Sequence, residues 1–127
     1  MKKLIFLAVG ALLVAVVLSL FLFRGSGPNR TIVRNSTGTT IYAVQLGVHE
    51  YRGTKSFSCN AESLATGDSM VLRHDLNDST VKLFYTLDGA SREHGEDYVD
   101  LWTGEGWLID VQPSGKIQSG HESVKND

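Results

Sequence analysis

The amino-acid sequence predicts an all-β fold, a small antiparallel β-sandwich of immunoglobulin-like size, that follows one N-terminal transmembrane helix. Residues 4–23 form an unbroken apolar run near the start of the chain. Beyond residue 30, apolar and polar residues alternate with a period of two, which is typical of strands with one buried face. Turn-forming residues interrupt this alternation at short intervals. A small β-barrel is the alternative fold.

The apolar run is the feature that predicts the helix. Residues 4–23 contain no charged side chain, and Gly10 and Ser19 are the least apolar members of the run. A helix of about 20 residues rises about 30 Å, which matches the hydrocarbon thickness of a bilayer. We therefore expect a signal-anchor helix over residues 1–23 that contacts the lipid bilayer through residues 4–23.

A cleaved signal peptide is the alternative for this segment. Lys2 and Lys3 would supply its charged start, but the apolar core is longer than such peptides usually have, and Gly25 to Pro28 make a poor cleavage site. Basic residues flank both ends of the run, so the positive-inside rule is nearly balanced. The opening resembles bacterial inner-membrane anchors, a type of leader that identifies no family. That resemblance implies a single pass through the inner membrane and a periplasmic C-terminal domain.

The remaining chain divides into a linker, one domain and a tail. Residues 24–30 are rich in Gly, Ser and Pro and predict a flexible linker. Residues 31–120 hold the strand pattern, and the polar residues 121–127 predict a disordered tail. Cys59 is the one cysteine, so an intrachain disulfide is impossible. We interpret it as a small buried hydrophobe, with a free reactive thiol as the alternative.

Turn chemistry predicts the pairing of the strands in the C-terminal half. The dipeptide Asp88-Gly89 favours a type I′ hairpin after Ser79–Leu87. We expect this hairpin to return through Ala90–His94 and to end there. Tyr98–Trp102, Trp107–Gln112 and Lys116–Ser119 should follow as a meander of three strands. In that register Leu101 faces Ile109, and Val111 faces Ile117. One apolar face results, made of Val99, Leu101, Trp107, Ile109, Val111 and Ile117.

The opposite face of this meander carries the candidate binding residues Tyr98, Asp100, Trp102 and Asp110. Asp100 would lie directly across from Asp110, and like charges placed so are normally destabilising. We hypothesise a partner-binding surface on which the two aromatic residues are anchors and the carboxylates receive a basic partner. A solvated pair of carboxylates and a bound cation are the alternatives.

A second polar cluster lies just before the predicted strand Tyr98–Trp102. Glu93, His94, Glu96 and Asp97 are metal-ligand types and weak metal candidates, but their spacing matches no metal-binding motif. No nucleophile elbow and no phosphate-binding glycine motif occurs, so we expect neither a catalytic residue nor a cofactor. The net charge is −2 and no basic stripe is present, which argues against nucleic acid as a partner.

These features together predict a membrane-tethered, non-catalytic module of the cell envelope that binds another envelope or membrane protein. The alternative is a small envelope hydrolase or metal-binding protein that uses the acidic cluster Glu93–Asp100.

Overall fold

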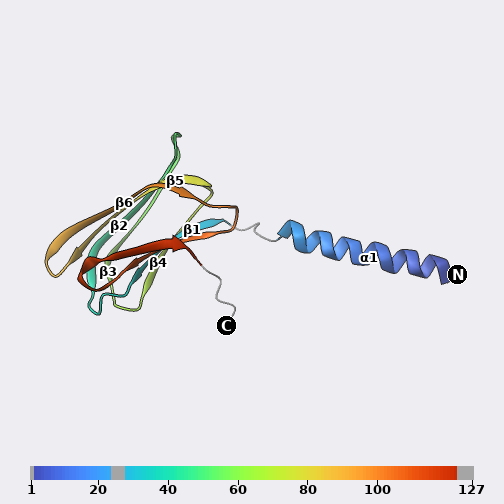
Figure 1. The fold of residues 1–127 in the computed structure, drawn as a ribbon, viewed down its shortest axis with the longest axis horizontal. Helices are drawn as coiled ribbons and strands as arrows, with labels where there is room; N and C mark the ends of the chain where they lie inside the picture. Colours follow the sequence, from blue (N-terminus) through green and yellow to red (C-terminus); the bar gives the residue numbers. More distant parts are fainter. Residues whose placement is uncertain (1, 24–27, 123–127) are drawn as a thin grey trace.

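The computed structural model describes the backbone of residues 2–23 and 28–122 and the side chains of residues 6–18 and 28–122. Within these ranges the chain forms one α-helix, eight strands and a short 3-10 helix (Figure 1). In chain order they are α1 (Lys2–Phe23), β1 (Asn29–Asn35), β2 (Ile41–Glu50), β3 (Ser56–Leu64), β4 (Ser69–His74), β5 (Asp78–Leu87), β6 (Ala90–Asp100), β7 (Gly106–Val111), η1 (Pro113–Gly115) and β8 (Ile117–His121).

The strands form a β-sandwich, as the sequence predicts. One four-stranded sheet has the order β4-β1-β7-β8, and the other has the order β3-β2-β5-β6. Figure 1 shows the two sheets as layers that pack face to face. The core between them is aliphatic, and its most buried side chains come from both sheets. The sandwich departs from a purely antiparallel arrangement at one place, because β1 pairs with β7 in parallel.

The β5–β6 hairpin forms where its turn residues predict it. Asp88 and Gly89 have φ values of 51° and 75°, as a type I′ turn requires at both central positions. Four alternating residues of β5 point into the core and are at most 4% exposed: Val81, Leu83, Tyr85 and Leu87. Period-two alternation and turn chemistry therefore fix this hairpin together.

A β-bulge shifts the alternation of β2. Ala43 has φ 50°, and the pairing of β2 with β5 shifts register between Tyr42 and Gln45. Ile41 and Val44 are both buried as a result, whereas Tyr42 is 55% exposed. A strict period of two places Tyr42 on the same face as Val44. That placement is wrong because the bulge inserts one residue into the strand.

The predicted three-strand meander is half right. The β7–β8 hairpin exists, and Val111 pairs with Ile117 as expected. The predicted hairpin between β6 and β7 is wrong: β6 pairs with β5 in one sheet, and β7 pairs with β1 in the other. The chain therefore changes sheets between Leu101 and Gly106. The six residues of the predicted apolar face still contribute to the core, because both sheets point their apolar side chains into the same layer.

The helix α1 lies apart from the sandwich in Figure 1. All of its described side chains, residues 6–18, are exposed. Among the residues that the structure describes, no helix combines the length and the apolarity needed to cross a membrane. The expected bilayer contact of residues 4–23 is thus not supported by the structure.

The domain is slightly longer at both ends than the sequence predicts. Asn29 and Arg30 belong to β1 and not to the linker, while residues 24–27 lie outside the described part of the chain. His121 ends β8, and Glu122 forms an ion pair with Arg30 at 2.6 Å. The rest of the predicted tail, residues 123–127, also lies outside the described residues.

Candidate binding surface at the linker end

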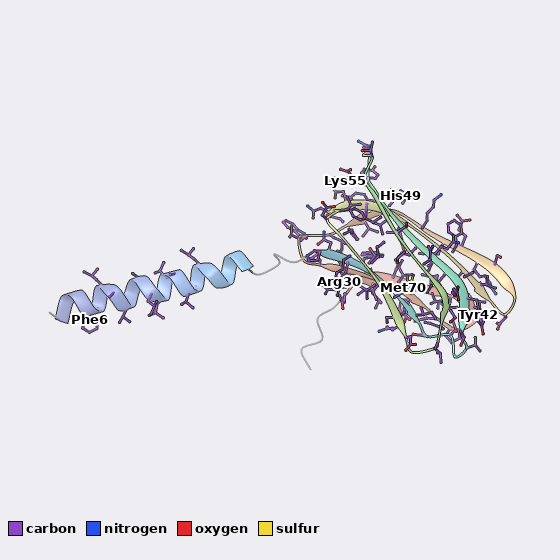
Figure 2. The ribbon with its side chains drawn as sticks, turned by 180° about the vertical axis from the view of Figure 1, so that it is seen from behind. Phe6, Arg30, Tyr42, His49, Lys55 and Met70 are labelled. Carbon is purple, nitrogen blue, oxygen red and sulfur yellow. The ribbon has the colours of Figure 1, made fainter. Side chains whose placement is uncertain are left out.

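One end of the sandwich receives the chain from α1, and we call it the linker end. It is formed by the first residue of β1 and by the loops 51–55, 75–77 and 101–105. Figure 2 shows Arg30 at this end and Tyr42 near the opposite one, and Lys55 marks the projecting tip of the β2–β3 hairpin. Three of the four predicted partner-binding residues lie here.

Trp102 is the most exposed aromatic side chain of the sandwich. The inside-outside alternation of β6 continues past its end, so Val99 and Leu101 are each 1% exposed while Tyr98 and Trp102 are 50% and 75% exposed. The backbone of Leu101 still donates to the Asn77 carbonyl, which holds this extension against the start of β5. Trp102 therefore projects outward from a backbone that the core fixes in place.

The loop that carries Trp102 is bonded to the start of β1. The amide of Glu105 donates to the Trp102 carbonyl at 3.1 Å and to the Asn29 side chain at 3.1 Å, and the Glu105 carbonyl accepts from the Arg30 amide at 3.0 Å. The Glu105 carboxylate accepts in turn from the Trp102 amide at 3.0 Å. Trp102 is thus one tight turn away from the residue at which the linker enters the domain.

Two tyrosines form a second aromatic group on this end. The rings of Tyr51 and Tyr98 contact edge to face with centroids 4.9 Å apart, and Tyr51 is 38% exposed. The Arg52 guanidinium lies over the Tyr51 ring, 5.2 Å from its centroid. The Tyr51 ring is thus in cation–π contact with one positive charge of this loop.

Two aspartates accompany these rings. Asp78 of β5 is the cross-strand partner of Asp100 of β6, and both are exposed. The Tyr98 hydroxyl donates to Asp78 at 2.8 Å. That hydrogen bond, together with partial desolvation and the charges of Asp78 and Asp100, raises the pKa of Tyr98 to about 12. Among the described residues neither carboxylate forms an ion pair, so the pair leaves a local negative charge on the surface.

Asp110 does not belong to this surface, and its predicted position opposite Asp100 is wrong. It lies on β7 in the other sheet, next to Arg34 of the parallel strand β1. Its side chain is 11% exposed, accepts from Arg34 at 3.1 Å and accepts from Ser36 at 2.6 Å. Burial raises the pKa of Asp110, but the hydrogen bonds from Arg34 and Ser36 and the Arg34 charge outweigh it and hold the pKa below its usual value. Asp110 is therefore a paired structural carboxylate.

The four weak metal candidates on β6 do not converge. His94 and Glu96 turn toward β8, where the His94 ring contacts Glu96 at 2.7 Å and Ser119 donates to the same carboxylate oxygen. Glu93 pairs with Phe84, whose side chain is exposed on the outer face. Among the described residues, no group of three or more histidine, cysteine, aspartate or glutamate side chains is arranged to hold a metal ion. The cluster therefore gives no geometric support to the metal-binding alternative.

Sequence reasoning missed Tyr51 and Asp78 as members of the surface. Asp78 is far from Asp100 in the sequence, and β5 pairs with β6 over its whole length only because the predicted break after His94 is absent. Tyr51 arrives from the β2–β3 hairpin, where its amide donates to the Asp78 carbonyl at 3.0 Å. Had β6 been predicted as one continuous strand, its register with β5 would have placed Asp78 opposite Asp100. We define the linker-end patch as Tyr51, Asp78, Tyr98, Asp100 and Trp102.

Comparison with known proteins supports the fold alone. No family model matches the chain, and no curated protein was found similar to it. A crystal structure of a Bacteroides ovatus protein, for which a role in cell adhesion has been suggested, superposes with a TM-score of 0.50 at 10% identity. The match covers 76% of this chain and 43% of that one, so this chain corresponds to less than half of that protein.

Two structures of the human-specific toxin intermedilysin also match. One has a TM-score of 0.47 at 14% identity and covers 79% of this chain and 24% of the toxin. The other, a disulfide-locked mutant with human CD59, has a TM-score of 0.43 at 13% identity and covers 76% and 24%. Both scores are too low to bear on the fold or the function of this chain.

Proposed function

We propose that this chain is a membrane-tethered, non-catalytic binding module whose linker-end patch holds another membrane or envelope protein. The observation that carries the proposal is the exposure of Trp102 on a rigid backbone, beside two further aromatic rings. Exposed tryptophan and tyrosine are the residue types that most often dominate the free energy of protein association. The fold that this chain shares with a protein of suggested adhesive role is compatible with such a module.

The tether rests on the sequence of the first 23 residues. Residues 4–23 are uncharged, α1 extends from Lys2 to Phe23, and its described side chains find no burial against the sandwich. A helix of this composition is stable where its apolar side chains leave water. We place the sandwich on the periplasmic side of an inner membrane, as the resemblance of the leader implies.

Membrane extraction and mass measurement test the tether. The protein should stay in the membrane fraction after alkaline carbonate washing, and its mass should include the first residues of the chain. Recovery of a soluble protein that lacks about the first 27 residues would show a cleaved signal peptide instead.

Site-specific photo-crosslinking tests the patch. A photoreactive amino acid at Tyr98 should trap a partner in membranes, and Trp102→Ala in the same chain should abolish or strongly reduce the product. Loss of a central aromatic anchor weakens binding by about 2 kcal/mol or more, a factor of roughly 30. A photoreactive residue at Tyr42, exposed near the opposite end, is the matched control. Equal products from both positions would contradict a partner site at the linker end.

A further inference from the structure

We infer that the linker-end patch faces the bilayer and takes a basic segment of its partner, one that leaves the membrane directly beside it. This inference rests on the proposed function and names the partner of the same site. Three features carry it: the place of the patch relative to α1, the short reach of the connection, and the charge of this end of the domain.

The patch lies at the end of the domain that α1 enters. Asn29 begins β1, and its side chain accepts from the Glu105 amide. The same amide donates to the Trp102 carbonyl, and the Glu105 carboxylate accepts from the Trp102 amide. Figure 1 shows that this end of the sandwich is turned toward α1. The place of the patch on the domain is therefore set by hydrogen bonds inside the folded domain.

The connection between helix and domain is short. Six peptide links separate Phe23 from Asn29, so even a fully extended chain spans at most about 20 Å. Trp102 is held one turn from Asn29 by the bonds of Glu105. With α1 in a bilayer, the patch stays within a few tens of ångströms of the headgroups. Confinement to this layer raises the effective concentration of the surface for segments of membrane-bound partners.

The linker-end patch is acidic, which selects the chemistry of the occupant. Its charged members are Asp78 and Asp100, and it contains no basic residue. Four basic residues lie at or near this end of the domain: Arg30, Arg52, Lys55 and Arg73. Arg30 and Lys55 already form ion pairs, with Glu122 and Asp75. Asp78 and Asp100 lie side by side without such a partner, beside rings that accept cations.

This charge favours a basic protein segment over the lipid surface itself. Anionic lipids at a membrane surface attract basic residues and repel an acidic patch. An arginine or lysine side chain, in contrast, gains from the two aspartates and from stacking on Trp102 or Tyr98.

The test uses the full-length protein in phosphatidylcholine vesicles. Trp107→Phe leaves Trp102 as the single tryptophan, so quenching of its fluorescence by acrylamide reports contact with the patch. The probe is a hexa-arginine peptide linked to a lipid in the same vesicles. We expect it to protect Trp102 at a concentration at least tenfold lower than the same peptide free in solution.

Charge variants identify the acceptor. Asp100→Asn should weaken the protection by the lipid-linked peptide several-fold. Asp88→Asn removes the same charge at the opposite end of the sandwich, where an asparagine tolerates the positive φ of that turn, and should change nothing. A lipid-linked hexa-glutamate peptide should give no protection.

Three results would overturn the inference. Protection of Trp102 in vesicles without any peptide would make the lipid surface the occupant. Equal protection by the free and the lipid-linked peptide would show that the patch does not face the membrane. No protection by either would exclude the basic chemistry. Carbonate washing of the same vesicles tests the tether separately. A protein that washes off contradicts the membrane tether of the proposed function, whereas a protein that stays bound leaves the quenching results to decide the inference about the patch.

Discussion

Replacement of Asp110 by asparagine should destabilise the domain by about 1–2 kcal/mol, although from the sequence alone this aspartate was expected to be a surface charge. The Ser36 hydroxyl donates to its carboxylate at 2.6 Å, and a hydrogen bond to a charged group contributes about 1.5–3 kcal/mol. The Arg34 guanidinium is 45% exposed, so its ion pair adds only about 0–1 kcal/mol. Asparagine keeps the volume of the side chain and one acceptor oxygen, so part of the stabilisation by Ser36 and Arg34 remains in the variant.

The matched control is Asp100→Asn. Asp100 is exposed and lies across from Asp78, so its neutralisation should leave the stability unchanged or raise it by up to about 1 kcal/mol. Urea unfolding of the full-length protein in mild detergent, followed by near-ultraviolet circular dichroism, measures both variants. For a domain of this size the Asp110→Asn change corresponds to a drop in Tm of roughly 5–15 °C.

The pH dependence gives the same prediction an independent check. Because the pKa of Asp110 is lower in the folded protein than its usual value of 3.8, its contribution is fully present above about pH 4. It is lost as the pH falls through the folded pKa, so the difference between wild type and Asp110→Asn should shrink in strong acid. If Asp110→Asn unfolds at the same urea concentration as wild type at pH 7, the Arg34–Asp110–Ser36 contacts do not stabilise the fold and the reasoning fails.

The remaining predictions concern a buried histidine, the core and the start of β1. His74 is 3% exposed and burial lowers its pKa below 6.5, so the unfolded chain binds the proton more readily and stability should fall as the pH drops from 7 to 5; equal urea midpoints at both pH values would contradict this. Ile109→Asp places an unpaired charge at a fully buried position and should unfold the domain, whereas Ile109→Val should cost about 1 kcal/mol; circular dichroism distinguishes the two. Asn29→Ala should cost about 2–4 kcal/mol in urea unfolding and speed hydrogen exchange of the Glu105 amide, which loses one of its two acceptors.

The local parts of the fold were predictable from the sequence. The Asp88-Gly89 turn fixes the β5–β6 hairpin and the Pro113-Gly115 turn fixes β7–β8, because each places neighbouring strands in one register. The apolar faces of β5 and of residues 98–111 were also predictable, since alternation separates inside from outside whichever strand lies alongside. That is why Val99 and Leu101 were assigned to the core correctly although their partner strand was not.

The pairing of distant strands could not be predicted in the same way. A hairpin of β6 and β7 satisfies the turn residues and the alternation as well as the observed fold does. Sheet β4-β1-β7-β8 forms instead because β1 supplies a second partner for β7, with Val33 beside Ile109 in the parallel register. Nothing within the 98–112 segment encodes the presence of β1. The wrongly predicted β6–β7 hairpin therefore assigned Asp110 to the wrong surface, whereas Tyr98, Asp100 and Trp102 were correctly assigned to the outside of the domain.

Asn29 shows how this nonlocal pairing builds the candidate site. By composition it belongs to a polar linker, yet its side chain is 2% exposed and donates to the Leu76 carbonyl at 2.7 Å while accepting from the Glu105 amide. One residue thus ties the loop before β5 to the loop after β6, and these are the loops that flank Asp78 and Trp102. The same residue receives the chain from α1. The position of the patch, at the end of the domain where the chain enters, is consequently set by buried hydrogen bonds of the domain itself.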